Sequence, residues 1–183
     1  MEGETTITLS IEGKIKGIKA ENFYRMLWDK SYIEYADPKP KEFKVVEQIN
    51  NNTDIAYIEV SLPFPMTNRD FVQKRFHASN KDDKELELGL YDSKHNYYVL
   101  MIQSIEHPQY PVQKSPIRAE IKMNYWLIED DPEVEGGMRF KTKVCQVLNG
   151  SLPLFFVNDL GPKMAHKNME KMIDTYFKIF GKQ

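Results

Sequence analysis

The sequence has little cysteine, little net charge and no long apolar runs. Cys145 is the one cysteine in 183 residues, so the chain cannot form an internal disulfide, and we expect a reducing compartment, the cytoplasm. Lys and Arg number 25 against 27 for Asp and Glu, without the basic excess usual in nucleic-acid-binding proteins. Apolar runs such as 154–157 are too short to cross a bilayer, and the first residues do not resemble a signal peptide.

The common catalytic and metal-binding motifs are also missing. The sequence contains no P-loop, GxGxxG, GxSxG or HExxH, and its histidines are not at metal-ligand spacing from one another or from Cys145. Carboxylate pairs such as 82–83 and 130–131 fall in turn-like segments, where exposure to solvent explains them. We therefore expect no metal and no cofactor, and a binding protein rather than an enzyme.

Alternation of apolar and polar residues with a period of two dominates the chain. It predicts two short strands within 5–19, and further strands at 43–49, 53–62, 71–78, 85–91, 96–105, 117–129 and 137–148. A short helix is predicted at 20–29, and the proline-containing segments 30–42 and 106–116 are predicted to be loops.

From Pro153 onward the pattern becomes helical, with a broad apolar stripe and a kink or break expected at Gly161-Pro162. The predicted fold is α+β, a curved antiparallel sheet wrapped around a long C-terminal helix. Such a sheet leaves an internal hollow that could hold a ligand. Methionines along the helix, such as Met164 and Met172, fit either ordinary core packing or an adaptable apolar lining.

Strand 71–78 poses a question about its polar residues. Period two places Phe71, Gln73, Arg75 and His77 on one face. If that face points inward, Arg75 is a buried charge that needs an anionic partner. If it points outward, Arg75 is an ordinary surface residue, and periodicity alone does not decide between the two.

Three short motifs carry a resemblance to a known family. Pro63-Phe64-Pro65-Met66 precedes Asn68-Arg69-Asp70, Ile117-Arg118-Ala119-Glu120 follows the proline-rich loop, and Gly150-Ser151-Leu152-Pro153 precedes the C-terminal helix. In this order they resemble the START (steroidogenic-acute-regulatory-related lipid transfer) domain, most of all its phosphatidylcholine transfer branch. The resemblance runs from about residue 5 to the end of the chain.

The resemblance implies a helix-grip fold around a tunnel for one lipid. It implies a single domain over 1–183, in which the family's N-terminal helix is missing or very short. Arg75 matches an arginine inside the family's cavity, which meets the lipid phosphate in the phosphatidylcholine branch. The pair Arg69-Asp70 and Arg118 match positions that we expect to be structural.

A set of lining and lid residues follows from the same resemblance. The expected lining residues are Arg75, Gln73, His77, Tyr57, Asn124, Phe156 and Met172, and the expected lid or hinge residues are Pro108, Pro111, Gly161 and Pro162. Thr142 and Val144 stand where an aromatic contribution to a choline cage is expected, so the headgroup is left open. Arg75→Ala is expected to weaken phospholipid binding and to leave the fold intact.

The implied function is that of a monomeric protein that binds one lipid, which we predict to be a phospholipid, and transfers it between membranes through transient surface contact. Two alternatives stay open. One is a sensor that binds a sterol or isoprenoid, and the other is an enzyme of the polyketide-cyclase kind, which needs a polar pair such as His77 with a carboxylate. Fold analogy alone does not separate these functions.

Overall fold

The computed structural model describes residues 6–36, 38–81, 95–150, 152 and 161–181. An eight-stranded sheet has the order β1-β8-β7-β5-β4-β3-β2, and β6 pairs in parallel with β4 beyond the end of β5. The strands are β1 (Thr6–Ile15), β2 (Glu42–Asn50), β3 (Thr53–Val60), β4 (Arg69–Ser79), β5 (Tyr97–Ser104), β6 (Ile117–Arg118), β7 (Glu120–Asp130) and β8 (Met138–Val147). Every neighbouring pair along the seven-strand order is antiparallel.

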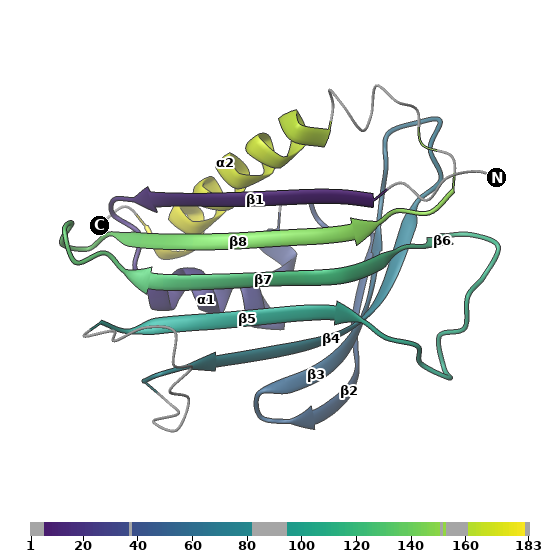
Figure 1. Ribbon diagram of the computed structural model, residues 1–183, viewed down its shortest axis with the longest axis horizontal. Helices are drawn as coiled ribbons and strands as arrows, with labels where there is room; N and C mark the ends of the chain where they lie inside the picture. The colour runs from purple at the N-terminus through teal and green to yellow at the C-terminus, as the bar shows by residue number, and fades with distance from the viewer. Residues whose placement is uncertain (1–5, 37, 82–94, 151, 153–160, 182–183) are drawn as a thin grey trace.

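Both helices cover the same side of this sheet, which curves around them (Figure 1). They are α1 (Ala20–Trp28) and α2 (Gly161–Phe180), and a 3₁₀ helix, η1 (Lys30–Tyr35), follows α1. The main core lies between the helices and the sheet, where Phe23 of α1 and Tyr176 of α2 pack with Ile128 and Phe140. We call this helix-covered side the inner face and the opposite side the outer face. The arrangement is the predicted helix-grip α+β fold.

The first strand differs from the prediction of two short strands around Glu12-Gly13. Strand β1 is continuous through Gly13, which pairs with Phe140 within the ladder that β1 forms with β8. A Cβ atom on Gly13 would lie 3.1 Å from Cε1 of Phe140, which is unusually close. The glycine therefore makes room for an aromatic ring and does not form a turn.

Most other predicted elements are confirmed within a few residues. The predicted strand 117–129 is divided, because β6 pairs with β4 whereas β7 pairs with β5 and β8. The predicted loop 30–42 contains η1, and the predicted strand 85–91 lies outside the described residues.

The C-terminal helix is described only from Gly161, so the predicted kink there stays a prediction. Pro162 is the second residue of the helix as described.

Candidate functional site

A row of inward-facing residues crosses the sheet at Arg75. The register pairs Arg75 with Asp54 on β3 and with Ile102 on β5, and Ile102 pairs with Asn124 on β7. Arg75 is only 6% exposed, whereas its neighbour Lys74 is exposed on the outer face. The inward interpretation of strand 71–78 is therefore the correct one.

The anionic partner of Arg75 is a residue of the protein itself. Nε of Arg75 donates to Oδ1 of Asp54 at 2.8 Å, and Nη2 donates to Oδ2 at 2.6 Å. Both side chains are buried, and the guanidinium lies over the rings of Trp28 and Phe43, at 4.6 and 5.1 Å from their centroids. This two-bond geometry is the kind that offsets the cost of removing two charges from water.

From this pair we predict that Arg75→Ala destabilises the fold, which differs from the expectation that the fold stays intact. Removing the arginine would leave Asp54 as a buried carboxylate without its counter-charge. Such a loss costs about 3–5 kcal/mol of stability, a large part of the total for one domain. The sequence did contain a signal for this partner, since Asp54 is a charged residue at the start of a strand that continues with Ile55 and Ala56.

Two further polar atoms on the inner face have no hydrogen-bond partner among the residues that the structure describes. Oδ1 of Asn124 on β7 and Oγ1 of Thr142 on β8 are buried and accept or donate no hydrogen bond within the described part of the chain. Thr142 is paired with Trp126, and Asn124 with Val144, so the two side chains start from adjacent strands. Buried polar groups are nearly always hydrogen-bonded, and such an exception is typical of a site where a ligand or water binds.

His77, also predicted to line the cavity, faces inward and links β4 to α1. Its Nδ1 accepts from the Tyr24 hydroxyl, its Nε2 lies 3.2 Å from the Asn51 carbonyl, and its ring lies 3.7 Å from that of Trp28 between centroids. A carbonyl can only accept, so Nε2 carries the proton in this arrangement. Both ring nitrogens are thus engaged in holding the fold.

Two pockets open on the inner face, one at each end of β4. The mouth pocket, of about 510 Å³, lies between β1, β3, β8 and the first turns of α2, and Phe71, Leu62 and Met164 are among its lining residues. The hairpin pocket, of about 350 Å³, lies between the end of α1 and the β2–β3 hairpin, and Arg75 and Asp54 line it. Gln73 stands between Phe71 and Arg75 on the same face and is buried.

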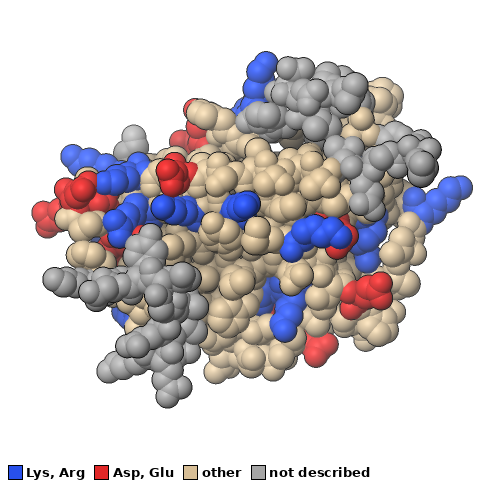
Figure 2. Space-filling view, viewed as in Figure 1, with Lys and Arg blue, Asp and Glu red and all other residues tan. Residues whose placement is uncertain are grey.

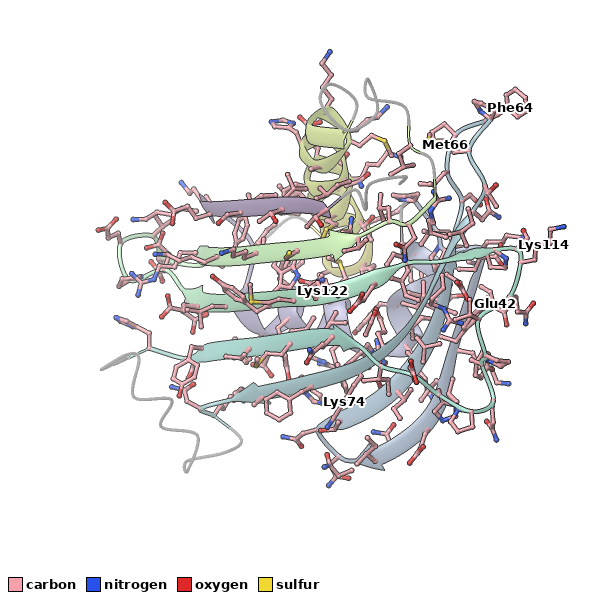
Figure 3. The ribbon with its side chains drawn as sticks, turned by 45° about the vertical axis from the view of Figure 1, so that its right-hand side comes forward. Glu42, Phe64, Met66, Lys74, Lys114 and Lys122 are labelled. Atoms are coloured by element: carbon pink, nitrogen blue, oxygen red, sulfur yellow. The ribbon has the colours of Figure 1, made fainter. Side chains whose placement is uncertain are left out.

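The loop between β3 and β4 forms one side of the mouth pocket. Phe64, at its tip, is 98% exposed, and Figure 3 shows it pointing away from the molecule. Behind it, Met66 and Leu62 pack in the same cluster as Met164 of α2. Sequence reasoning missed this exposure, although an aromatic residue between two prolines in a turn is the pattern that could have indicated it.

Arg69 connects the three motifs of the resemblance. Its guanidinium donates to the carbonyls of Thr67, Leu148 and Asn149, the last at 2.7 Å. Burial lowers the pKa of Arg69, which is almost fully enclosed. Gly150 has φ of +70°, and a Cβ atom there would lie 2.9 Å from Cδ1 of Ile117 and 3.4 Å from Nη2 of Arg69.

The neighbouring residues of the same motif are structural as well. Asp70 forms a two-bond ion pair with Arg118, whose Nε and Nη2 donate at 3.1 and 3.0 Å. Nδ2 of Asn68 donates to Glu59 at 2.8 Å, and Lys41 donates to the same carboxylate, so these bonds hold the pKa of Glu59 below its usual value. The expected structural roles of Arg69, Asp70 and Arg118 agree with these contacts.

Tyr57 does not lie where the resemblance placed it. It pairs with Val72 on the outer face and stacks on Tyr110 of the 106–116 loop, with ring centroids 4.7 Å apart. Burial raises the pKa of Tyr57 to about 12. Strand parity explains the correction, because Tyr57 is three residues from the inward-facing Asp54 and therefore points to the other face.

The expected lid residues Pro108 and Pro111 lie on the same side of the sheet as this stacking. Pro108 and Pro111 line a pocket of about 570 Å³ with Tyr110 and Arg118, and Arg118 faces Asp70 on the outer side of the sheet. They are therefore not at the inner cavity. Met172 packs against the main core on the inner side, and Phe156 lies outside the described residues.

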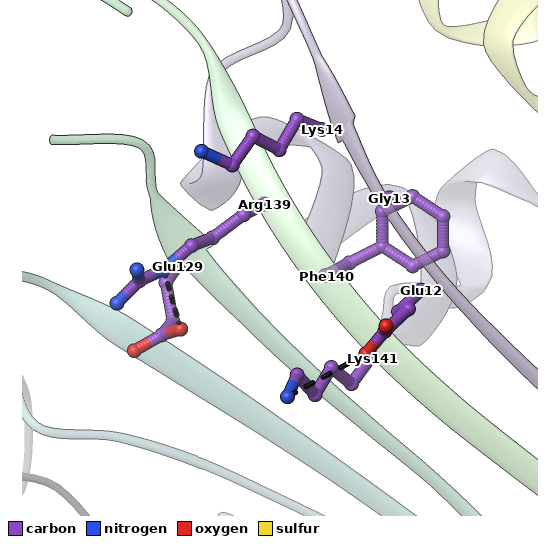
Figure 4. Close-up of a pocket in the computed structure, with 7 residues that line it drawn as sticks. All are labelled: Glu12, Gly13, Lys14, Glu129, Arg139, Phe140 and Lys141. Carbon is purple, nitrogen blue, oxygen red and sulfur yellow. Dashed lines mark hydrogen bonds and ion pairs between the residues drawn. The ribbon is translucent and has the colours of Figure 1, made fainter. Parts of the chain in front are cut away.

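A further pocket, of about 420 Å³, lies at the β1–β8 end of the sheet (Figure 4). Its charges are mutually satisfied, since Arg139 donates to Glu129 at 2.8 Å and Lys141 lies 3.5 Å from Glu12. No group of residues that could hold a metal ion occurs in the described ranges. None of the helices that the structure describes is long and apolar enough to cross a membrane.

The inner face, the mouth and the three converging motifs agree with a family assignment. The START domain family model matches residues 15–166. The chain belongs to the START domain family. Among curated proteins, mouse and human START domain-containing protein 10 are each 27% identical over 161 residues, and mouse phosphatidylcholine transfer protein is 27% identical over 158 residues.

These matches cover 88% and 85% of this chain, but 50% and 64% of the relatives. The chain thus spans about half the length of START domain-containing protein 10. The relatives' names describe a START domain protein and a transfer protein, and neither states an enzymatic activity.

Solved structures show the same START fold. The crystal structure of human STARD10 superposes with a TM-score of 0.76 at 24% identity, covering 93% of this chain and 63% of that one. Human StAR-related lipid transfer protein 5 superposes with a TM-score of 0.75 at 14% identity, covering 94% of this chain and 76% of that one. The Zhui aromatase/cyclase from a Streptomyces species superposes with a TM-score of 0.55 at 10% identity, covering 95% of this chain and 93% of that one. An enzyme therefore also uses this architecture.

Proposed function

We propose that the 183 residues act as one lipid-binding domain, which holds a single lipid between the inner face and α2 and carries it between membranes. The observation that carries the proposal is the buried polar lining behind the helices: the Arg75–Asp54 pair together with the unpartnered atoms of Asn124 and Thr142. The named relatives, which include a phosphatidylcholine transfer protein, support it. The carrier acts as a cytoplasmic monomer and catalyses no reaction.

The lining matters because acyl chains alone provide little net affinity. Burying a methylene in an apolar environment gains about 0.8 kcal/mol, but a bilayer gives the chain a similar gain. Transfer from membrane to protein is therefore favoured mainly by contacts to the headgroup. Of the inward-facing polar residues, Arg75 and Asp54 supply the charged contacts. Asn124 and Thr142 supply atoms that have no hydrogen-bond partner among the described residues.

The pairing of Arg75 with Asp54 favours a zwitterionic headgroup among phospholipids. The pair has no net charge, so a purely anionic phosphate would compete with Asp54 for the guanidinium. A headgroup with both a phosphate and an ammonium group can satisfy Arg75 and Asp54 separately. The hairpin pocket beside them adds the ring of Trp28, a suitable neighbour for a cation.

A sterol or isoprenoid with a hydroxyl group is the second candidate, because the pair is closed in this structure. A single hydroxyl can donate to Asp54 and accept from Arg75 without separating them. A polyketide-cyclase activity has less support, because His77 uses both ring nitrogens in structural contacts.

Lipid would enter and leave through the mouth pocket. Phe64 projects beside it and would insert into the membrane surface, while the first turns of α2 form its opposite wall. Gly161 and Pro162 stand at the start of those turns, and we propose them as the hinge that lets α2 move aside.

The test is native mass spectrometry of lipids that copurify with the full chain, repeated after exposure to mixed vesicles. One zwitterionic phospholipid per chain is the expected result. The matched variant is the double substitution Asp54→Asn with Arg75→Gln, which removes both charges and keeps hydrogen-bonding groups of similar size. Loss of phospholipid with retention of the fold supports the charged anchor. Unchanged phospholipid loading would contradict it, and copurification of a sterol or isoprenoid instead would favour the second candidate.

A further inference from the structure

The outer face carries an apolar surface that the lipid-binding role does not use. Across it, the register pairs Phe76 with Met101, Met101 with Tyr125, and Tyr125 with Lys143. Met101 is 52% exposed and Met123, on the next row, is 38% exposed. We call Phe76, Met101, Met123 and Tyr125, with Lys74 and Lys143 at their margins, the outer patch.

The two charged residues at the margins of the outer patch, Lys74 and Lys143, are both basic. Lys74 lies on β4 beside Gln103, and neither Lys74 nor Lys143 has a carboxylate within 4 Å among the residues that the structure describes. The nearby acidic residue Glu120 is already bonded to Lys122 at 2.6 Å. Figure 2 shows mostly uncharged atoms over the centre of this face, with both basic and acidic side chains around them, and Figure 3 labels Lys74 and Lys122 there.

We propose that the outer patch binds an acidic amphipathic helix of a partner protein. The apolar side of such a helix would cover Met101, Met123 and Tyr125, and its carboxylates would lie over Lys74 and Lys143. Methionine side chains are flexible and polarizable, so they adapt well to the side chains of a docked helix. Charge complementarity sets the orientation and excludes basic partners.

A second copy of the chain fits this surface less well. A symmetric dimer brings the same patch of both copies together, so the basic margins would face one another. Like charges facing one another across an interface are unfavourable.

A membrane also fits less well, because Phe64 and the mouth pocket lie at the β3–β4 loop and α2, whereas the outer patch lies on the middle strands (Figures 1 and 3). A molecule docked by its mouth would leave the patch free for a protein. The function that follows is recruitment: the partner could hold the domain at a membrane without blocking lipid exchange.

The experiment uses a fluorescein-labelled synthetic peptide of about 14 residues, roughly four helical turns, with leucine and phenylalanine on one side and glutamate on the other. Fluorescence anisotropy measures its binding to the full chain at two salt concentrations. We expect micromolar affinity that weakens at higher salt. Met101→Glu should weaken binding tenfold or more, and Lys74→Glu should weaken it and reduce the salt dependence. Lys163→Glu, at an exposed position on α2, is the matched control and should not change it.

Thermal melts establish that each variant is folded. If Met101→Glu does not fold, Met101→Ala replaces it in the binding measurement. Equal or tighter binding of a charge-inverted peptide, with lysine in place of glutamate, would overturn the proposal. So would wild-type affinity in the Met101 variant. If Met101→Glu abolishes a concentration-dependent dimer of the wild type, the patch binds a second copy of the chain. If it abolishes binding to vesicles, the patch binds a membrane. Either result would overturn the proposal as well.

Discussion

At the residue scale, Asp54 determines the electrostatics of the inner face as much as Arg75 does. An arginine alone in this position would attract any anionic headgroup. Paired in two-bond geometry with Asp54, it forms a neutral site with a donor side and an acceptor side. Selectivity then depends on whether a ligand can replace both halves of the pair.

Substitutions of Arg75 and Asp54 should have strongly coupled effects on the free energy of unfolding. Arg75→Gln alone is expected to cost about 3–5 kcal/mol because Asp54 stays buried and charged. The double variant with Asp54→Asn should cost clearly less than the sum of the two single changes. Urea unfolding of the four proteins measures the coupling, and additive losses would mean that the two side chains do not interact in the folded protein.

Glu59 should contribute stability that depends on pH. Hydrogen bonds from Lys41 and Asn68 lower the pKa of this carboxyl in the folded state. Its contribution is therefore present above the unfolded-state pKa and is lost as the pH falls through the lower, folded-state pKa. Because Lys41 is largely exposed, we expect Glu59→Gln to cost only about 1 kcal/mol at pH 7.

The melting temperatures of the wild type and Glu59→Gln, measured from pH 7 to pH 3, should converge at the acid end. Glu12→Gln is the control, since the carboxylate of Glu12 is exposed and its ion pair with Lys141 is long, at 3.5 Å. A constant difference across the range would show that the carboxylate charge is not the cause.

At the element scale, a strand is easiest to predict where one of its faces packs and the other is solvated. Thr6–Ile15 alternates between exposed and partly buried residues along its whole length. The false division at Glu12-Gly13 arose because a glycine in a ladder and a glycine in a turn look alike in sequence. Only the position of Phe140, over 120 residues away in sequence, distinguishes them.

The inner-face site was predictable only in part, for a related reason. Parity places Gln73, Arg75 and His77 on one face, but the partner of Arg75 depends on the register between β3 and β4. Register is set by pairing across the whole sheet and cannot be read from one strand. Parity applied to β3 would have excluded Tyr57 once Asp54 was known to face inward.

The connection after β8 should be especially sensitive to substitution. Gly150→Ala places a side chain at φ of +70° and brings its Cβ within 2.9 Å of Ile117. We expect the free energy of unfolding to fall by about 2–3 kcal/mol, which is more than the backbone strain at positive φ would cause by itself. Gly136→Ala is the matched control, because it has φ of +67° but open space around it, and should cost about 1 kcal/mol. Equal losses in the two variants would show that the contact with Ile117 and Arg69 does not matter.

At the scale of the whole molecule, the two faces of the sheet have different roles in our proposals. The inner face holds the lipid, the β3–β4 loop and α2 form its mouth, and the outer patch remains accessible while the mouth meets a membrane. The separation predicts that changes at the mouth affect transfer and leave binding at the outer patch unaltered.

Phe64→Ala should therefore slow lipid transfer between vesicles without reducing the amount of lipid that copurifies. Burying a phenylalanine side chain is worth about 1.5–3 kcal/mol, so its loss should lower the transfer rate roughly tenfold if the ring enters the bilayer during exchange. Val112→Ala is the control, since Val112 is 72% exposed on the 106–116 loop, whose Tyr110 packs on the outer face. Transfer of a fluorescent phospholipid between donor and acceptor vesicles gives the rate. If Phe64→Ala transfers as fast as the wild type, or if Val112→Ala is equally slow, the β3–β4 loop is not the element that meets the membrane.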